Sequence, residues 1–151
     1  MTFCAPVQPP NLGAAVASAK IHLSNEVYDL HKKLQGKIKL FNSLAKLYDL
    51  PLYSDAMSPV KFICLGKPEA GYEIVKRLMA RGFYVSISCY PSVPYNNTGI
   101  RVPVTLHTTD QDIENVIKAI AEILPVVIAE AGYEMKDIYR SFKMKVPSVL
   151  Q

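Results

Sequence analysis

Two stretches in the middle of the chain alternate between apolar and other residues, which is the pattern of strands with one buried face. The segment between them, 90–98, contains two prolines and two asparagines, so it is too long and too irregular for a tight hairpin. We therefore expect two adjacent strands joined by a shaped loop. The apolar positions are Phe83, Val85, Ile87 and Cys89 in the first stretch and Ile100, Val102, Val104 and Leu106 in the second.

Other segments repeat their apolar residues every three or four positions, as amphipathic helices do. The longest is 24–50, where the lysines fall largely on the opposite face and Pro51 ends the tract. A second helix is expected at 68–82, with a proline in its first turn and Gly82 as its C-terminal cap. A helix with many small residues, beginning near Asn11, is expected to precede both.

The last third of the chain is also helical in pattern. Thr109 and Asp112 resemble a capping box, and the apolar stripe that follows them predicts a helix. Pro125 is expected to break or kink that helix. Residues 134–142 are expected to form a short amphipathic piece.

A further strand is predicted at 60–66, where the apolar run VKFICLG ends at a glycine. From residue 60 onward the order is then strand, helix, strand, loop, strand, helix. This order indicates an α+β fold. Taken from the pattern alone, it also permits a ferredoxin-like layer.

Composition narrows the class of protein. The chain has 151 residues, of which 50% are hydrophobic and 20% charged, so it is long enough to bury a core. The formal charge of +4 comes from 17 basic and 13 acidic residues that are dispersed, without the basic runs and interleaved aromatics of nucleic-acid binders. A mild positive charge suits an anionic substrate such as a coenzyme A ester, and equally an ordinary surface.

The cysteines and the N-terminus bear on location. Cys4, Cys64 and Cys89 are an odd number at wide spacing, with no histidines placed to complete a zinc site, so we expect no metal. Free thiols within strands fit a reducing compartment. There is no signal-peptide pattern and no apolar run of about 18 residues. We therefore expect a cytoplasmic protein that does not span a membrane.

Arg101 is the one charged residue within the second alternating stretch. Its guanidinium stays protonated and presents several donors, so beside a shaped loop it can bind a carboxylate or phosphate in bidentate fashion. An arginine on the polar side of a half-buried strand is also an ordinary solvent-exposed residue. The pattern alone leaves both interpretations open.

The motifs around Arg101 resemble a known family. An apolar strand, the loop YPSVP, the tripeptide GIR and the segment TLHTTDQDI follow one another and lead into an apolar-periodic helix. This order is similar to the C-terminal small domain of pyridoxal-phosphate enzymes of the α-oxoamine synthase family, in the fold-type-I aminotransferase group. The resemblance covers nearly the whole chain, and on it Arg101 matches the arginine that binds the carboxylate of the amino-acid substrate.

The resemblance implies a fold and a domain division. It implies a small antiparallel sheet of about three strands packed against helices and preceded by long N-terminal helices. Residues 1–57 would be an extended segment with linker helices, and 58–151 the small domain. The proline-rich opening resembles the segment that in the family follows the Schiff-base lysine, so Met1 is expected to be an added start in the C-terminal part of a longer enzyme.

The resemblance also implies an activity. The parent enzyme would be a homodimeric transferase that condenses an amino acid with an acyl-CoA, using pyridoxal phosphate as an electron sink. The family keeps the cofactor-binding lysine, aspartate and stacking aromatic upstream. We therefore assign this chain no catalytic and no cofactor-binding residue, and expect it to bind no pyridoxal phosphate and to be inactive alone.

Two positions depart from the family pattern. The histidine-threonine pair of the family falls on Thr108 and Thr109, so His107 is one position early and is expected to be a surface imidazole. At 4–7 the family has hydroxyl residues that reach the cofactor phosphate, whereas this chain begins that stretch with Cys4. We assign no cofactor contact there.

Two alternatives belong to other classes. One is a free-standing ferredoxin-like module without catalysis, in which Arg101 and the loop 90–98 bind a small anion. The other is an interaction domain whose first helix pairs with a copy of itself. A self-contained module is expected to cover the small-residue face of 11–19, whereas a fragment leaves that face exposed.

Overall fold

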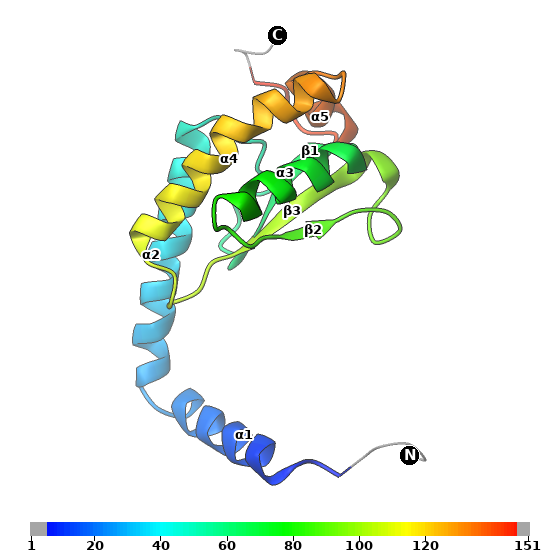
Figure 1. Cartoon of the computed structure of the whole chain (residues 1–151). Helices are drawn as coiled ribbons and strands as arrows, with labels where there is room; N and C mark the ends of the chain where they lie inside the picture. The colour runs from blue at the N-terminus through cyan, green and yellow to red at the C-terminus, as the bar shows by residue number, and fades with distance from the viewer. Residues whose placement is uncertain (1–5, 148–151) are drawn as a thin grey trace.

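The computed structural model describes residues 6–147 and has the expected α+β fold, with a three-stranded antiparallel sheet and five α-helices in that range (Figure 1). The predicted segments correspond closely to the observed elements. These are α1 (Pro9–His22), α2 (Glu26–Leu47), β1 (Val60–Gly66), α3 (Pro68–Ala80), β2 (Ser86–Ser88), the 3-10 turn η1 (Tyr95–Asn97), β3 (Thr98–Pro103), α4 (Asp110–Glu130) and α5 (Met135–Ser141).

The sheet has the order β1-β3-β2, with β3 antiparallel to both neighbours. Arg101 of β3 lies opposite Phe62 of β1 and Ser86 of β2. The two alternating stretches therefore pair with each other, as predicted, and the run at 60–66 supplies the third strand. The sheet implied by the resemblance is confirmed.

Two of the three strands are shorter than the alternation predicted. The segment before Ser86 stays bound to the end of α3, since Phe83 donates its N–H to the Leu78 carbonyl at 2.9 Å and Gly82 adopts φ +84°. β3 ends at Pro103, which has no N–H to donate, and one further bond follows it, from the Val104 N–H to the Pro59 carbonyl at 2.7 Å. The expected strand residues Leu106 and His107 instead belong to a turn.

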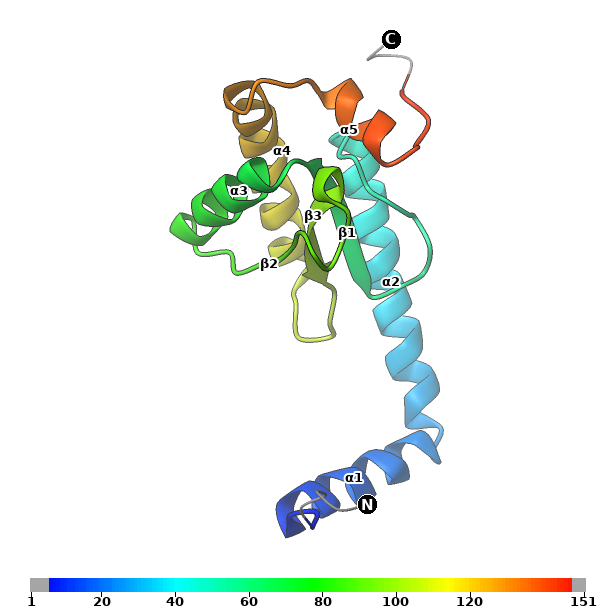
Figure 2. The ribbon, with the colours of Figure 1, turned by 90° about the vertical axis from the view of Figure 1, so that its right-hand side faces the viewer.

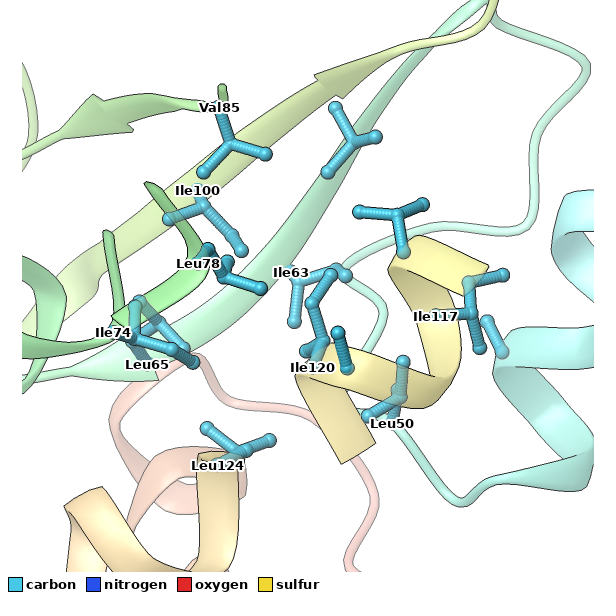
Figure 3. Packing of buried hydrophobic residues seen from close by; sticks show 14 of the residues in the cluster. Leu50, Ile63, Leu65, Ile74, Leu78, Val85, Ile100, Ile117, Ile120 and Leu124 are labelled. Carbon is cyan, nitrogen blue, oxygen red and sulfur yellow. The ribbon is translucent and has the colours of Figure 1, made fainter. Parts of the chain in front are cut away.

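The core lies between the sheet and the helices α3 and α4, and the second half of α2 packs on α4 (Figures 1 and 3). One face of the sheet contributes alternating residues of β1 and β3, and each helix contributes its apolar stripe. The residues at the centre of this packing are Ile63, Leu65, Ile74, Leu78, Ile100, Ile117, Ile120 and Leu124.

α4 begins with the predicted capping box. The Thr109 hydroxyl accepts the Asp112 N–H at 3.1 Å, and the Asp112 carboxylate accepts the Thr109 N–H at 2.9 Å. The helix then continues through Pro125 to Glu130, so the proline does not end it. Buried side chains on both sides of the proline, Leu124 and Val127 among them, hold the two halves against the core.

α1 stands apart from the rest of the molecule. It meets α2 at a bend around Ser24 and extends away from the sheet and the other helices (Figures 1 and 2). All of its residues are exposed, whereas Ile38, Phe41 and Ala45 of α2 are buried in the core. The boundary expected between 57 and 58 stays a prediction, and the second half of α2 packs with the residues that follow it.

Candidate functional site

Arg101 lies on the face of the sheet that points away from α3 and α4. Its neighbours Ile100 and Val102 are buried on the core side, while Arg101 is exposed beside Phe62 and Ser86. We call the face that carries Phe62, Ser86 and Arg101 the open face. Within residues 6–147 the Arg101 side chain has no hydrogen-bond or ion-pair partner, so its donors are free to bind a ligand.

The loop between β2 and β3 has a defined shape, as predicted. The Ser92 N–H donates to the Cys89 carbonyl at 2.9 Å, and the Tyr90–Pro91 peptide bond is cis. The Tyr95 hydroxyl donates to the Glu69 carboxylate at 2.8 Å, which ties the loop to the start of α3.

The hydrogen bond between Tyr95 and Glu69 also shifts the pKa values of both side chains. Hydrogen bonds from its own backbone N–H and from Tyr95 lower the pKa of Glu69, and the bond to Glu69 raises the pKa of Tyr95. Both shifts favour the state in which the tyrosine keeps its proton and the carboxylate is ionised. The tie therefore persists across the neutral pH range.

An apolar cavity of about 310 Å³ opens on the same side of the sheet, between β1, the loop and the end of α5. Three aromatic rings line it, with centroids 6.0 to 6.1 Å apart in edge-to-face or tilted contacts. We call it the aromatic pocket. Its lining residues are Tyr53, Phe62, Val93, Pro94, Asn97 and Phe142.

Gly99 makes room for the central ring of this pocket. A Cβ at Gly99 would lie 2.3 Å from Cε1 of Phe62 and 2.6 Å from the Ile63 carbonyl oxygen. Phe62 therefore leans along the open face into the space above Gly99, while Arg101, two residues further on, stays uncovered. The missing side chain at 99 is what lets the ring join the other two aromatics.

The structure does not bring His107, Thr108 and Thr109 into a common site with Arg101. His107 is exposed in the turn after β3, the surface position expected for it. Thr108 offers its carbonyl to Lys37 Nζ at 2.6 Å, and Thr109 caps α4. Both threonines have structural contacts here. Cys4 lies outside the described residues.

Lys61 is the one lysine within the three strands, and it is buried. Lys61, which is only 1% exposed, donates from Nζ to the Ala56 carbonyl at 2.6 Å, and burial lowers its pKa. It points to the core side of β1, away from Arg101. The described residues also contain no cluster of acidic, histidine and cysteine side chains that could hold a metal ion, and none of their helices is long and apolar enough to cross a membrane.

Sequence reasoning missed the aromatic pocket and the burial of Lys61. Alternation in VKFICLG predicts that Lys61 and Phe62 lie on opposite faces, but not which of the two faces the core. Polarity alone would place Phe62 on the core face and Lys61 on the exposed face, whereas the structure buries Lys61 on the core face. The available signal for a close contact was a glycine, Gly99, inside a predicted strand region.

No protein-family model matches this chain. Individual curated proteins, however, do match it. The 8-amino-7-oxononanoate synthase of Saccharophagus degradans is 28% identical over 126 residues, which are 83% of this chain and 31% of the synthase. The synthase of the same name from Beijerinckia indica is 32% identical over 117 residues, 78% of this chain and 28% of its own. The chain thus spans about a third of the length of the curated relatives it matches.

Solved structures of related enzymes also superpose on most of this chain. The 8-amino-7-oxononanoate synthase from Francisella tularensis superposes with a TM-score of 0.65 at 27% identity, over 78% of this chain and 33% of its own. A serine palmitoyltransferase from S. paucimobilis with a bound PLP–myriocin aldimine has a TM-score of 0.74 over 83% of this chain and 31% of its own; at 17% identity this shows a shared fold. The resemblance inferred from the loop and strand motifs is therefore confirmed: this chain is related to the pyridoxal-phosphate-dependent α-oxoamine synthases of fold type I.

Proposed function

We propose that this chain is the C-terminal part of a pyridoxal-phosphate-dependent transferase that condenses an amino acid with an acyl-CoA, and that Arg101 binds the carboxylate of the amino acid. One observation carries the proposal. The arginine that matches the family motif stands exposed on the open face, without a partner in residues 6–147, beside a loop tied in place.

An arginine so placed suits carboxylate binding. Its guanidinium can donate two parallel hydrogen bonds to one carboxylate, which fixes the orientation of the ligand as well as its position. β3 is the central strand, paired on both sides at Arg101, so the backbone beneath the guanidinium is rigid. A rigid base reduces the entropy lost when the ligand binds.

The cofactor chemistry would come from outside these residues, because the family keeps its cofactor-binding lysine, aspartate and stacking aromatic upstream. We therefore expect the 151 residues alone to bind no cofactor and to be inactive. The length of the relatives supports this expectation, since about two thirds of each lies beyond the matched region. The complete exposure of α1 also supports it, because a free-standing module was expected to cover that helix.

The test is amino-acid binding to the complete enzyme carrying Arg101→Ala. We expect the KM or Kd for the amino acid to rise by about tenfold to a hundredfold, the usual effect of losing a hydrogen bond to a charged group. The KM for the acyl-CoA is expected to stay unchanged. Arg140→Ala is the matched control, since Arg140 is exposed and paired with Asp137 instead. Unchanged amino-acid affinity in the Arg101 variant would refute the assignment.

A second candidate is a free-standing module that binds a small carboxylate without catalysis. The observation in its favour is that Arg101 and the aromatic pocket both belong to this chain, so a ligand could bind without further residues. The two functions differ in one measurement. If the complete reading frame, mixed with pyridoxal phosphate, gains no absorption band that is abolished by borohydride, the module is the correct assignment.

A further inference from the structure

We propose that Ser86 is a positioning residue for Arg101. When the arginine binds its carboxylate, the Ser86 hydroxyl accepts a hydrogen bond from the guanidinium and holds it in the binding orientation. The inference rests on the proposed function and adds a second residue to the same site. It follows from the pairing of β2 with β3, from the hydrogen-bonding groups of the two side chains and from the chemistry of their neighbours.

Ser86 and Arg101 lie directly opposite each other in the antiparallel pair β2–β3. Both are exposed on the open face, whereas Ile100 is buried and Ile87 points toward Gly71 of α3 on the core side. Directly opposite residues of such a pair have Cβ atoms about 4.5–5.5 Å apart on one face of the sheet. An arginine side chain that lies along this face can therefore bring its Nε–H to the serine hydroxyl.

A bound carboxylate leaves part of the guanidinium without an acceptor. The group has five N–H donors, and a bidentate carboxylate accepts two hydrogen bonds. When the two terminal nitrogens hold the ligand, the Nε–H needs a different acceptor or water. Within residues 6–147 neither the Arg101 guanidinium nor the Ser86 hydroxyl has a hydrogen-bond partner, so the two groups are available to each other.

The two cross-strand partners of Arg101 differ in chemistry. Phe62 on β1 carries an apolar ring that leans over Gly99 and has no oxygen or nitrogen to accept the bond. Ser88, the other serine of β2, is opposite Gly99 and is only a diagonal neighbour of Arg101, about 7–8 Å away. Ser86 is therefore the direct partner of Arg101 whose side chain can accept a hydrogen bond.

A guanidinium held at one edge is better prepared for a ligand than a free one. The arginine side chain has several rotatable bonds, and ordering it when a ligand binds costs free energy. A hydrogen bond at Nε fixes the plane of the group and leaves its two terminal nitrogens side by side for the carboxylate. Ser86 then affects the amino acid through Arg101 and has no part in binding the acyl-CoA.

The first experiment measures binding to the complete enzyme of glycine, L-alanine and L-serine, and the tightest binder of the three is the probe. We expect Ser86→Ala to raise the Kd of the probe by about threefold to tenfold, the usual effect of losing one hydrogen bond. The KM for the acyl-CoA should stay unchanged. Ser86→Thr keeps the hydroxyl and should keep the affinity. Ser88→Ala, the same change on the same strand, is the matched control and should leave the Kd unchanged.

A second measurement tests the contact itself, without activity. The 151-residue chain has four arginines, so their Nε–H signals can be resolved in NMR spectra. With sodium acetate as the carboxylate, the Arg101 Nε–H should exchange with water about threefold to tenfold faster in Ser86→Ala than in the unchanged chain, because its acceptor is lost. The Arg77 Nε–H, which donates to Glu73 at 2.8 Å, is the internal control and should not change. Equal exchange of the Arg101 signal in both proteins would overturn the inference.

The double variant separates a positioning role from an independent one. Because Ser86 acts through Arg101, Ser86→Ala should have no effect on the Kd in a protein that already carries Arg101→Ala. An equal effect in both backgrounds would show that Ser86 acts without Arg101, and the inference would be wrong.

The proposed function fails in a different way. If none of the three amino acids binds, or if Arg101→Ala leaves their affinity unchanged, the carboxylate site is wrong, and the inference built on it fails too. If Arg101→Ala weakens binding while Ser86→Ala does not, the carboxylate site stands and only the role of Ser86 is wrong.

Discussion

Gly99 and Phe62 share one space on the open face, and this single contact shapes the candidate site. The Phe62 ring occupies the volume that any side chain at 99 would need. Because the Ile63 carbonyl oxygen would also lie only 2.6 Å from a Cβ at 99, the backbone blocks the site as well. The glycine is therefore required by packing against a neighbouring strand.

Gly99→Ala is expected to lower the free energy of unfolding by about 1–3 kcal/mol, the range for an overpacked core substitution. Urea unfolding followed by circular dichroism measures it. Gly36→Ala is the matched control, because a Cβ there meets nothing within 4 Å and alanine is the better helix former, so it should stabilise by about 0.5–1 kcal/mol. Equal effects of the two substitutions would contradict the steric explanation.

The stability that Tyr133 contributes to the fold is expected to depend on pH. Its hydroxyl donates to the Leu65 carbonyl at the end of β1, and burial raises its pKa to about 12. The folded chain thus keeps this proton at pH values where the unfolded chain, with a pKa near 10, releases it. The stabilisation by Tyr133 is present below pH 10 and is lost as pH rises toward 12.

Tyr133→Phe should therefore cost about 1–3 kcal/mol at pH 7, because it leaves the Leu65 carbonyl without its donor. The difference between the two proteins should shrink as the pH rises from 10 toward 12. Urea unfolding at pH 7 and at several alkaline values measures both effects. Tyr28→Phe, at a residue that is 71% exposed, serves as control. A difference that stays constant with pH would rule out the role of the proton.

Among the elements, α4 depends on its N-terminal cap. The capping box satisfies backbone donors of the first turn, and its hydrogen bonds, first that from the Thr109 hydroxyl, lower the pKa of Asp112. Because the pKa of Asp112 is lower in the folded chain than its unfolded value near 3.8, the ionised carboxylate stabilises the fold at pH values above 3.8. This stabilisation is lost as the pH falls through the pKa of the folded chain.

Thr109→Ala is expected to destabilise the fold by about 1 kcal/mol at pH 7, as is usual for loss of an N-cap. The loss should become smaller as the pH falls below about 3.8 and through the lower pKa at which folded Asp112 takes up its proton. Thermal unfolding between pH 2.5 and pH 7 measures this change. Thr105→Ala, at an exposed threonine outside the helix, should have a much smaller effect at every pH. An acid-independent loss would show that Asp112 has no part in the cap.

At the scale of the whole molecule, stability resides in the part of the chain that surrounds the sheet. α1 buries none of its residues and extends away from this part (Figure 2). Leu12, Val16 and Leu23 are between 49% and 90% exposed. In the proposed longer enzyme these side chains would contact other parts of the protein.

Deleting residues 1–23 is therefore expected to leave the urea midpoint of the remaining chain unchanged, since the described residues of this segment, 6–23, are all exposed. Unfolding at two protein concentrations, by tyrosine fluorescence, provides the measurement. If the complete chain unfolds at a higher midpoint than the deletion, and more so at high concentration, α1 pairs with a copy of itself. That result would favour the interaction domain over the proposed enzyme fragment.

Local signals in the sequence were sufficient to place the secondary structure. The helices at α2, α3 and α4 and the strand β1 follow from periodicity, and Gly82 and Thr109 mark two of the helix ends where the structure has them. These features depend on residues close together in the chain. The motif around Arg101 likewise identified the family, because its residues are contiguous.

Only the tertiary structure decided which face of β1 is buried, and therefore that Lys61 points inward and Phe62 lines a pocket. Alternation states which residues share a face but not what covers that face. The aromatic pocket is built from residues of four separate segments, so no local pattern could reveal it. The sequence by itself determined the elements and the arginine, whereas long-range packing decided what lies beside that arginine.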